Sequence, residues 1–292
     1  MKIDINTKMI TLLGKPLGQS FAARMQNAGY EAAGLNMLYF YTEVDKDHLG
    51  DVVNGLRYMN FAGFAVTKPN KVRVLRYLDE LDPLCKKMGA SNTVVKTPEG
   101  KLIGYNTDGV GFYTSLVEEG KINVEESTFF CFGAGGAGRA MCSVLAYHGA
   151  KKIYITDFYE PCAESLVMDI NENFAPVAEL VHHGDYAKIA ECNVVMNASG
   201  IGMGSTIGQT PMPVEHIQPG QFYFDACYNP DKTQFLLNAE EKGCQVLNGL
   251  GMSLYQGAAQ IELWTGEKAP VEAHGHPGGE QVRTPHLRCA LF

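Results

Sequence analysis

The chain has 292 residues, the length of about two domains, and its 46% hydrophobic against 19% charged residues exclude a disordered chain. The net charge is −8 and the basic residues are scattered, so nucleic acid is not an expected partner. No apolar run approaches the ~18 residues of a membrane helix, and Asp4 precedes any apolar stretch, so neither a membrane span nor a signal peptide is predicted. The eight cysteines lack CxxC pairs and zinc-site spacing, which indicates reduced thiols, a cytoplasmic protein and no metal.

Short apolar strands alternate with helices along the chain, a pattern typical of α/β folds with mainly parallel sheets. In the first block we expect strands at 9–13, 38–41, 64–66, 93–96 and 102–105, with helices at 22–33, 47–59 and 71–78. In the second block we expect strands at 129–132, 153–156, 194–197, 223–226 and 245–247, with helices at 140–148 and 160–171. A helix at 110–119 bridges the blocks, and one at 253–265 returns to the first.

A glycine-rich loop follows the first strand of the second block and opens a helix. Gly133, Gly135 and Gly138 form the pattern G-x-G-x-x-G, and the next strand ends at Asp157, 24 residues after Gly133. This is the context in which the motif binds a dinucleotide, because the glycines permit a tight turn and close approach of a pyrophosphate. The helix N-terminus also favours phosphate groups. The alternative is a glycine-rich turn that binds no ligand.

Asp157 bears on which dinucleotide is bound. A carboxylate at the end of the second strand binds the ribose hydroxyls of NAD and repels the 2′-phosphate of NADP. No arginine lies within the next ten residues. We therefore expect NAD as the cofactor, and the alternative is an aspartate that merely caps the helix from Glu160.

The first block carries the candidate chemical groups. Oxidation of an alcohol needs a group that takes the hydroxyl proton as the hydride leaves. Three polar stretches adjoin strands, at residues 67–71, 89–93 and 106–108, where α/β sheets place ligands. The spacing does not choose between Lys68 and Lys71, and the alternative is surface lysines with turn-forming Asn and Asp residues.

A series of ordered motifs spans residues 9–272. They look like N-V-T-x-P-H-K at 65–71, G-A-V-N-T-V at 89–94, G-x-N-T-D-x-x-G-F at 104–112, N-A-T-P-x-G-M at 197–203, Y-N-P-x-x-T at 228–233 and G-x-x-M-x-x-x-Q-G-A at 249–258. In this order they resemble the shikimate/quinate dehydrogenase family.

The resemblance implies a role for each matched position. It selects Lys71 as the catalytic lysine, paired with Asp108. It implies that the substrate is held by Ser20, Thr67, Asn92, Tyr228 and Gln256. The expected cofactor-binding residues are Gly133, Gly135, Gly136, Ala137, Gly138, Asp157, Asn197, Ser199 and Gly249. The loop at Asp157 resembles that of the NAD-using, quinate-tolerant members.

Two departures from the family pattern concern the substrate. The family loop H-S-x-S-P-x-x-H-N corresponds to residues 19–27, where Ser20 and Asn27 match but Ala22 replaces the second serine. One hydroxyl expected to hold the substrate carboxylate is therefore missing, and a hydrogen bond to a charged group is worth ~1.5–3 kcal/mol. Ala65 replaces the family's asparagine. Arg24 is a candidate replacement contact, with a solvated helix arginine as the alternative.

The sequence thus predicts an α/β protein with a Rossmann-type NAD-binding domain at 111–248 and a smaller α/β substrate-binding, catalytic domain at 1–110 plus 249–272. Residues 273–292 are expected to be a flexible tail or an added remnant. The predicted function is hydride transfer between NAD and a ring hydroxyl of shikimate, quinate or a related cyclitol carboxylate, as in aromatic amino acid biosynthesis. The alternatives are a relative acting on another polyol or an amino analogue, and a non-catalytic NAD or metabolite sensor. A small-molecule substrate is expected, and a homodimer stays open.

Overall fold

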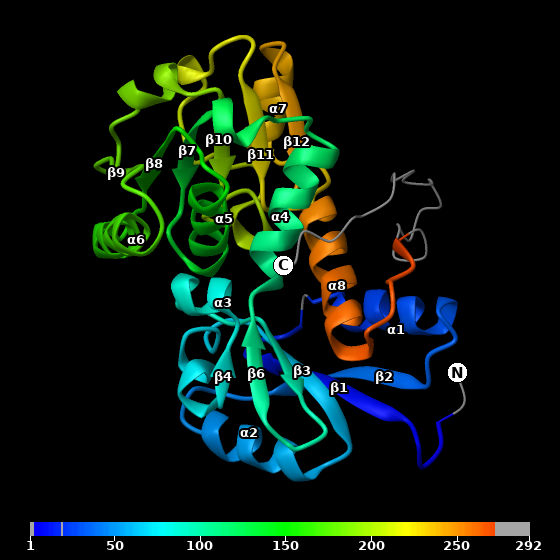
Figure 1. The fold of residues 1–292 in the computed structure, drawn as a ribbon. Helices are drawn as coiled ribbons and strands as arrows, with labels where there is room; N and C mark the ends of the chain where they lie inside the picture. Colours follow the sequence, from blue (N-terminus) through cyan, green and yellow to red (C-terminus); the bar gives the residue numbers. More distant parts are fainter. Residues whose placement is uncertain (1–2, 19, 272–292) are drawn as a thin grey trace. The chain divides into compact units, whose positions relative to one another are not determined.

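The computed structural model describes residues 3–18 and 20–271. The chain divides into two compact units, Met1–Thr107 with Leu254–Phe292, and Asp108–Ser253 (Figure 1). The predicted domain borders after residues 110 and 248 lie close to these unit borders, and the chemical role of each unit stays a prediction. The predicted tail, 273–292, lies outside the described residues.

The first unit contains a six-stranded sheet in the order β2-β1-β3-β5-β6-β4. Its strands are β1 (Lys8–Gly14), β2 (Met37–Glu43), β3 (Phe61–Val66), β4 (Glu80–Leu81), β5 (Thr93–Lys96) and β6 (Leu102–Tyr105). β1 runs parallel to β2 and β3, but β5 is antiparallel to both β3 and β6. The short turn at 97–101 joins β5 to β6 as a hairpin and so makes these two strands antiparallel, whereas parallel strands need a long crossover.

Four α-helices belong wholly or partly to this unit, namely α1 (Ala22–Ala32), α2 (Leu49–Tyr58), α3 (Pro83–Met88) and most of α8 (Leu250–Thr265). The expected helix at 71–78 is only a 3-10 turn, η1 (Arg73–Tyr77). α3 was not predicted from the sequence, although Asp82 caps its first turn and Gly89 ends it at φ 65°. Trp264 of α8 packs against Tyr39 and donates to the Val94 carbonyl at 3.0 Å, which fixes α8 on the sheet.

The second unit contains a six-stranded, wholly parallel sheet in the order β12-β11-β10-β7-β8-β9. Its strands are β7 (Thr128–Phe132), β8 (Lys152–Thr156), β9 (Ala178–Leu180), β10 (Val194–Asn197), β11 (Phe222–Asp225) and β12 (Gln245–Asn248). The helices are α4 (Thr107–Glu118), α5 (Gly136–Tyr147), α6 (Glu160–Asn173) and α7 (Gln234–Glu241). β9 and α7 were not expected from the sequence.

This strand order makes the second unit a doubly wound, Rossmann-type fold, and the predicted α/β fold class is confirmed. The chain order reverses between β7 and β10, so the loops after these two strands diverge at the carboxyl edge. A doubly wound sheet offers its ligand crevice at this point. Within the described part of the chain, no helix is long and apolar enough to span a membrane.

Candidate functional site

The candidate residues of the first unit gather at one edge of its sheet. Because β5 is antiparallel, its first residue, Thr93, pairs with Ala65 near the end of β3 and with Tyr105 at the end of β6. The loops that leave β3 and β6 and the loop that enters β5 therefore meet at the same edge. Thr67, Asn92 and the start of α4 lie on these three loops.

Asn92 is the centre of a buried hydrogen-bond network at this edge. Its Nδ2 donates to Thr107 Oγ1 at 3.0 Å and to Gln256 Oε1 at 3.4 Å. Its Oδ1 accepts from the Thr107 backbone N–H at 2.8 Å and from the Thr93 hydroxyl at 2.9 Å. The structure thus brings Asn92 and Gln256 together, and it fixes the orientation of the Asn92 amide.

The network continues through residues that the sequence analysis did not single out. Gln260 Nε2 donates to Thr93 Oγ1, and Gln26 Nε2 donates to Gln260 Oε1, both at 2.9 Å. Both glutamines are buried. Their spacing gave a usable indication, because Gln256 and Gln260 lie one turn apart on α8 and share a face. The network ties α1, β5 and α8 to the edge that carries Asn92.

Lys71 lies beside the same edge. Its carbonyl accepts from the Ser91 N–H at 2.9 Å, one residue before Asn92. Lys71 is half-buried, whereas Lys68 is exposed. The second catalytic candidate, Asp108, is buried and belongs to the other unit, in the first turn of α4.

Ser20 lies on the loop between β1 and α1. Its Oγ accepts from the Ala22 N–H at 3.3 Å. Ala65 is buried within β3, and Arg24 is exposed on α1. Asn27, which matches the family loop, donates to the Tyr39 carbonyl and accepts from the Tyr39 N–H, both at 2.8 Å. Asn27 therefore holds α1 against the edge strand β2.

The cofactor candidates of the second unit lie at the carboxyl ends of its parallel strands. Gly133 has φ 99°, and a Cβ there would lie 2.6 Å from the Ser199 nitrogen. A Cβ on Gly138 would lie 1.9 Å from the Gly133 carbonyl oxygen, and one on Gly249 would lie 2.1 Å from the Ala226 carbonyl oxygen. At these three positions the backbones approach so closely that only glycine fits.

The start of α5 fits a pyrophosphate. No side chain caps the helix at Gly135, and its first turn holds no acidic residue. Gly135 and Gly136 are exposed, and a Cβ on Gly135 would meet no atom within 4 Å. The first N–H groups of a helix have no partner inside it, so this end offers donors and a favourable field to a phosphate. Ala137 follows in the same turn and is half-buried.

Asp157 is bonded to the glycine-rich loop. Its Oδ2 accepts from the Ala134 N–H at 2.7 Å, and its Oδ1 accepts from the Tyr159 N–H at 2.9 Å. Glu160 lies nearby along the chain, and hydrogen bonds from the His183 N–H and the His182 ring lower its pKa below the ordinary value. The segment after β8 is therefore anionic.

Asn197 is fully buried and takes part in a network of its own. Its Nδ2 donates to the Ile201 carbonyl and to the Asp225 carboxylate, while its Oδ1 accepts from the Ser199 N–H and hydroxyl. Burial raises the pKa of Asp225, and hydrogen bonds from Thr233, Cys227 and Asn197 oppose that rise. Asn197 thus fixes the loop that carries Ser199.

Tyr228 lies on the loop after β11 and is half-buried. The threonine that ends its motif, Thr233, donates to Asp225 at 2.6 Å and also caps α7. Thr233 belongs to the motif at 228–233, but no role was predicted for it from the sequence.

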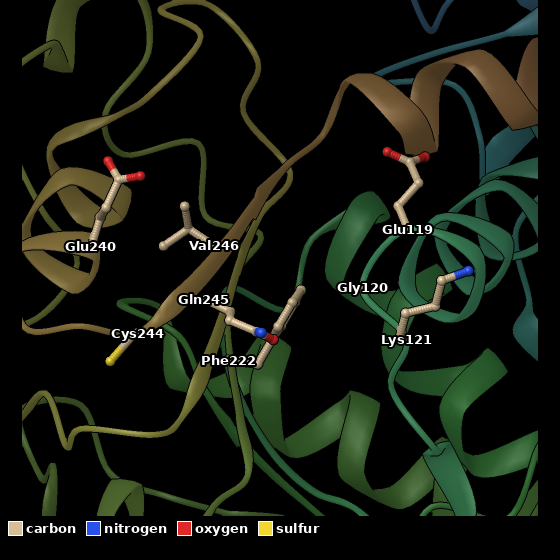
Figure 2. A pocket seen from close by; sticks show the side chains of 8 residues that line it. All are labelled: Glu119, Gly120, Lys121, Phe222, Glu240, Cys244, Gln245 and Val246. Carbon is tan, nitrogen blue, oxygen red and sulfur yellow. The ribbon is translucent and has the colours of Figure 1, made fainter. Parts of the chain in front are cut away.

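A hollow of about 370 Å³ lies elsewhere in the second unit, lined by Glu119, Gly120, Lys121, Phe222, Glu240, Cys244, Gln245 and Val246 (Figure 2). Phe222 and Gln245 begin β11 and β12, so the hollow is at the amino edge of the sheet, opposite the glycine-rich loop. None of the candidate site residues lines it. Among the described residues, no cluster of His, Cys, Asp and Glu has the arrangement of a metal site.

Comparison with known proteins decides the family. The model of the shikimate dehydrogenase substrate binding domain matches residues 12–94, and that of the shikimate 5′-dehydrogenase C-terminal domain matches residues 249–273. A shikimate dehydrogenase (NADP(+)) from Desulforamulus reducens is 39% identical over 275 residues, covering 93% of this chain and 94% of the relative. The chain belongs to the shikimate dehydrogenase family.

Two solved structures are similar to the chain over most of its length. The shikimate 5-dehydrogenase of Listeria monocytogenes, in complex with shikimate and NAD, is 37% identical with a TM-score of 0.89, covering 94% of this chain and 97% of that one. The 5-ketofructose reductase of a Gluconobacter strain is 31% identical with a TM-score of 0.83, covering 93% and 97%. The resemblance found in the motifs is thereby confirmed, and the two matched segments contain Ser20, Thr67, Lys71, Asn92, Gly249 and Gln256.

Proposed function

We propose that this family member is an NAD-dependent oxidoreductase that transfers a hydride between the cofactor and a ring hydroxyl of shikimate, quinate or a related cyclitol carboxylate. Family membership supports the reaction class, and the Listeria structure named for shikimate and NAD supports both ligands. The single observation that carries the choice of cofactor is the Asp157 carboxylate at the glycine-rich loop.

In this proposal the dinucleotide, when bound, supplies the hydride acceptor at its nicotinamide ring. Lys71 takes the proton of the substrate hydroxyl, and Asp108 is the carboxylate that works with it. A lysine serves as a proton shuttle when its surroundings favour release of the proton. Lys71 is proposed for that role because it is half-buried beside the edge that carries Asn92, whereas Lys68 is exposed.

The substrate would be held by side chains whose positions are fixed by hydrogen bonds. Asn92 and Gln256 contact each other, and Thr107 and Thr93 orient the Asn92 amide. A binding group that is fixed before the ligand arrives loses less entropy on binding. Thr67, Ser20 and Tyr228 complete the proposed set.

The cofactor would lie on the uncapped start of α5, with its phosphates at Gly135, Gly136, Ala137 and Gly138. Gly133 and Gly249 would allow the backbone to approach the cofactor closely. The Asn197 amide would bond to Ser199 and hold its loop in place for the cofactor, without contacting the cofactor itself. This arrangement needs no cationic side chain at the phosphates, because the helix end itself attracts them.

NAD is proposed over NADP although the Desulforamulus relative is named for NADP(+). Asp157 accepts from two backbone N–H groups, which hold its carboxylate at the glycine-rich loop, and a 2′-phosphate would meet that carboxylate. Glu160 adds a second anion to the same segment. A like charge placed against the wrong ligand is one of the two ways in which a site discriminates, beside attractive contacts to the right ligand.

Steady-state kinetics with NAD and NADP on shikimate and quinate test the proposal. We expect kcat/KM to be higher with NAD, and Asp157→Ala should narrow the difference by improving the use of NADP. Asp157→Asn is the matched control, because it removes the charge and keeps an acceptor for the Ala134 N–H. A wild-type preference for NADP would overturn the cofactor choice, and a protein that binds NAD without turning over any substrate would be a sensor.

A second candidate substrate is a different polyol, and a specific observation favours it. Ala22 and Ala65 replace polar residues of the family pattern, and a 31% identical structure is named as a 5-ketofructose reductase. Activity on 5-ketofructose but not on the cyclitol carboxylates would establish this alternative. The same assay plate, with NADH absorbance as the readout, separates the two.

A further inference from the structure

The loop that carries Ser20 is fastened to the edge strand β2 by two side chains. Tyr41 Oη accepts from the Ala23 N–H at 3.0 Å and donates to the Ser20 carbonyl at 2.7 Å. Glu43 accepts from the Leu17 N–H at 2.9 Å. Residues two apart on a strand face the same way, so Tyr41 and Glu43 together hold this loop from one side.

The hydrogen bonds of Tyr41 define what its hydroxyl can do. A phenol has one proton, and the Ser20 carbonyl can only accept, so that proton is used there. The oxygen accepts from Ala23. Tyr41 therefore has no proton left to offer to an anionic ligand while it holds the loop.

The Ser20 hydroxyl, in contrast to that of Tyr41, keeps its proton available. Its Oγ accepts from the Ala22 N–H at 3.3 Å, and none of the described residues accepts its proton. A serine hydroxyl that accepts inside the loop and keeps its proton can donate to a carboxylate. The backbone of Ser20 is held at its carbonyl by Tyr41 and at its N–H by the Leu17 carbonyl, at 3.0 Å.

The local sequence explains why a tyrosine is needed here. The family pattern has serine and proline where this chain has Ala22 and Ala23. Proline has no N–H, so Ala23 adds a donor at the start of α1. The residue before this helix, Phe21, provides no side-chain cap. Tyr41 satisfies the added donor and fixes the serine that remains.

We propose that Tyr41 is a positioning residue that holds the Ser20 hydroxyl in place for the carboxylate of the substrate. The inference rests on the proposed function and adds a residue of β2 to the specificity of its site. Tyr41 does not touch the substrate in this role, and it acts through Ser20 and the first turn of α1.

The test is Tyr41→Phe, assayed with NAD on shikimate and on shikimate methyl ester, which lacks the negative charge. The variant loses both the hydrogen bond to the Ser20 carbonyl and the acceptor for the Ala23 N–H, and this loss of positioning should raise KM for shikimate about three- to tenfold. The value of kcat should stay within about twofold, because no group of the proton transfer is removed. The KM of the ester, or its inhibition constant if it is not turned over, should rise less, because a hydrogen bond to a neutral ester carbonyl is weaker than one to a carboxylate.

Two further variants make the result specific. Tyr58→Phe is the matched control, since the Tyr58 side chain is 90% exposed on α2, and it should leave both constants unchanged. Ala22→Ser in the Tyr41→Phe background should lower KM for shikimate again, because it returns a hydroxyl to the loop. Thermal melting of each variant separates a positioning effect from a loss of folded protein.

The outcomes distinguish this inference from the proposed function. A wild-type enzyme that turns over no carboxylate substrate overturns both. An active wild type whose KM is unaffected by Tyr41→Phe overturns the inference alone. An equal rise of KM on shikimate and on the ester also overturns it, because Tyr41 would then shape the site without regard to the carboxylate.

Discussion

The sheet edges that carry the candidate site residues differ in chemistry between the two units. In the first unit the edge consists of side chains, with Asn92, Thr93 and Gln260 joined in a buried hydrogen-bond network. In the second unit the edge consists of backbone, with Gly133 and Gly138 packed so closely that a Cβ would overlap main-chain atoms.

The two edges are therefore sensitive to different kinds of substitution. A side-chain edge is weakened when a partner is removed, and each buried group left unpaired costs ~1–3 kcal/mol. A backbone edge is disrupted when an atom is added, because neighbouring main chain cannot move aside cheaply. The proposed substrate specificity therefore depends on which side chains are present, whereas the proposed phosphate site depends on glycines, which have no side chain.

The largest expected effect is at the side-chain edge. Lys71→Ala should lower kcat about 10²- to 10⁴-fold, the contribution of a positioned acid–base group. NAD affinity, measured by fluorescence titration, should be nearly unchanged, because the glycine-rich loop lies in the other unit. Lys68→Ala is the matched control and should do much less, since Lys68 is exposed. Equal losses from the two variants would show that Lys71 has been wrongly chosen.

The backbone edge is tested by adding one methyl group. Gly138→Ala should lower the free energy of unfolding by about 3 kcal/mol or more and abolish NAD binding, because its Cβ would meet the Gly133 carbonyl oxygen. Gly135→Ala, three residues away, adds the same atom into open space and should leave unfolding unchanged. Denaturant unfolding and NAD titration measure both. A stable Gly138→Ala variant that binds NAD would contradict the steric account.

A smaller change in the free energy of unfolding is expected when a buried hydroxyl is removed, and it should depend on whether that hydroxyl is hydrogen-bonded. Thr93→Val keeps the shape of the side chain but removes the acceptor of Gln260 Nε2 and one of the donors to Asn92 Oδ1, so it should cost ~1–3 kcal/mol. Ser115→Ala removes a buried hydroxyl that has no partner among the described residues, so it should be neutral or slightly stabilising. Urea unfolding of the two variants gives the comparison, and equal losses would mean that the network contributes nothing beyond packing.

The smallest expected effect is a change with pH in the second unit. Burial raises the pKa of Asp225 above the 3.8 of a free aspartate. The folded protein therefore holds this proton more tightly than the unfolded chain, and the contribution of Asp225 to stability is lost as pH rises from about 4 through its folded pKa. Asp225→Asn cannot titrate. The stability difference between wild type and variant should thus shift in favour of the variant as pH rises, measured by thermal melting across that range.

A shift in the opposite direction would mean that the hydrogen bonds from Thr233, Cys227 and Asn197 outweigh burial. The variant should still be the less stable protein at low pH, because asparagine has one acceptor oxygen for the three donors.

Much of the molecule followed from local sequence. The apolar runs at β7, β8 and β10 predicted buried parallel strands within a residue of their bounds, because a strand covered on both faces reads as a continuous hydrophobic run. The glycines of the loop after β7 were recognisable for a similar reason, since close backbone approach excludes every other residue. The motif spacing also identified the family before any geometry was known.

The pairings between distant segments are set by tertiary packing and could not be predicted from the sequence. Residues far apart in the chain are joined in three places. They are the antiparallel pairing of β5 with β3, the hydrogen bonds of Gln26 and Gln260 in the Asn92 network, and the hydrogen bond from Tyr41 to the Ser20 carbonyl. Gln26 and Tyr41 do not stand out by local pattern, because a glutamine on a helix or a tyrosine on an edge strand is ordinary, and only the spacing of Gln260 from Gln256 gave an indication. Local sequence determines which segments form helices and strands through short-range sterics and periodic burial, whereas the partner of a polar side chain is set by which segments the packed core brings together.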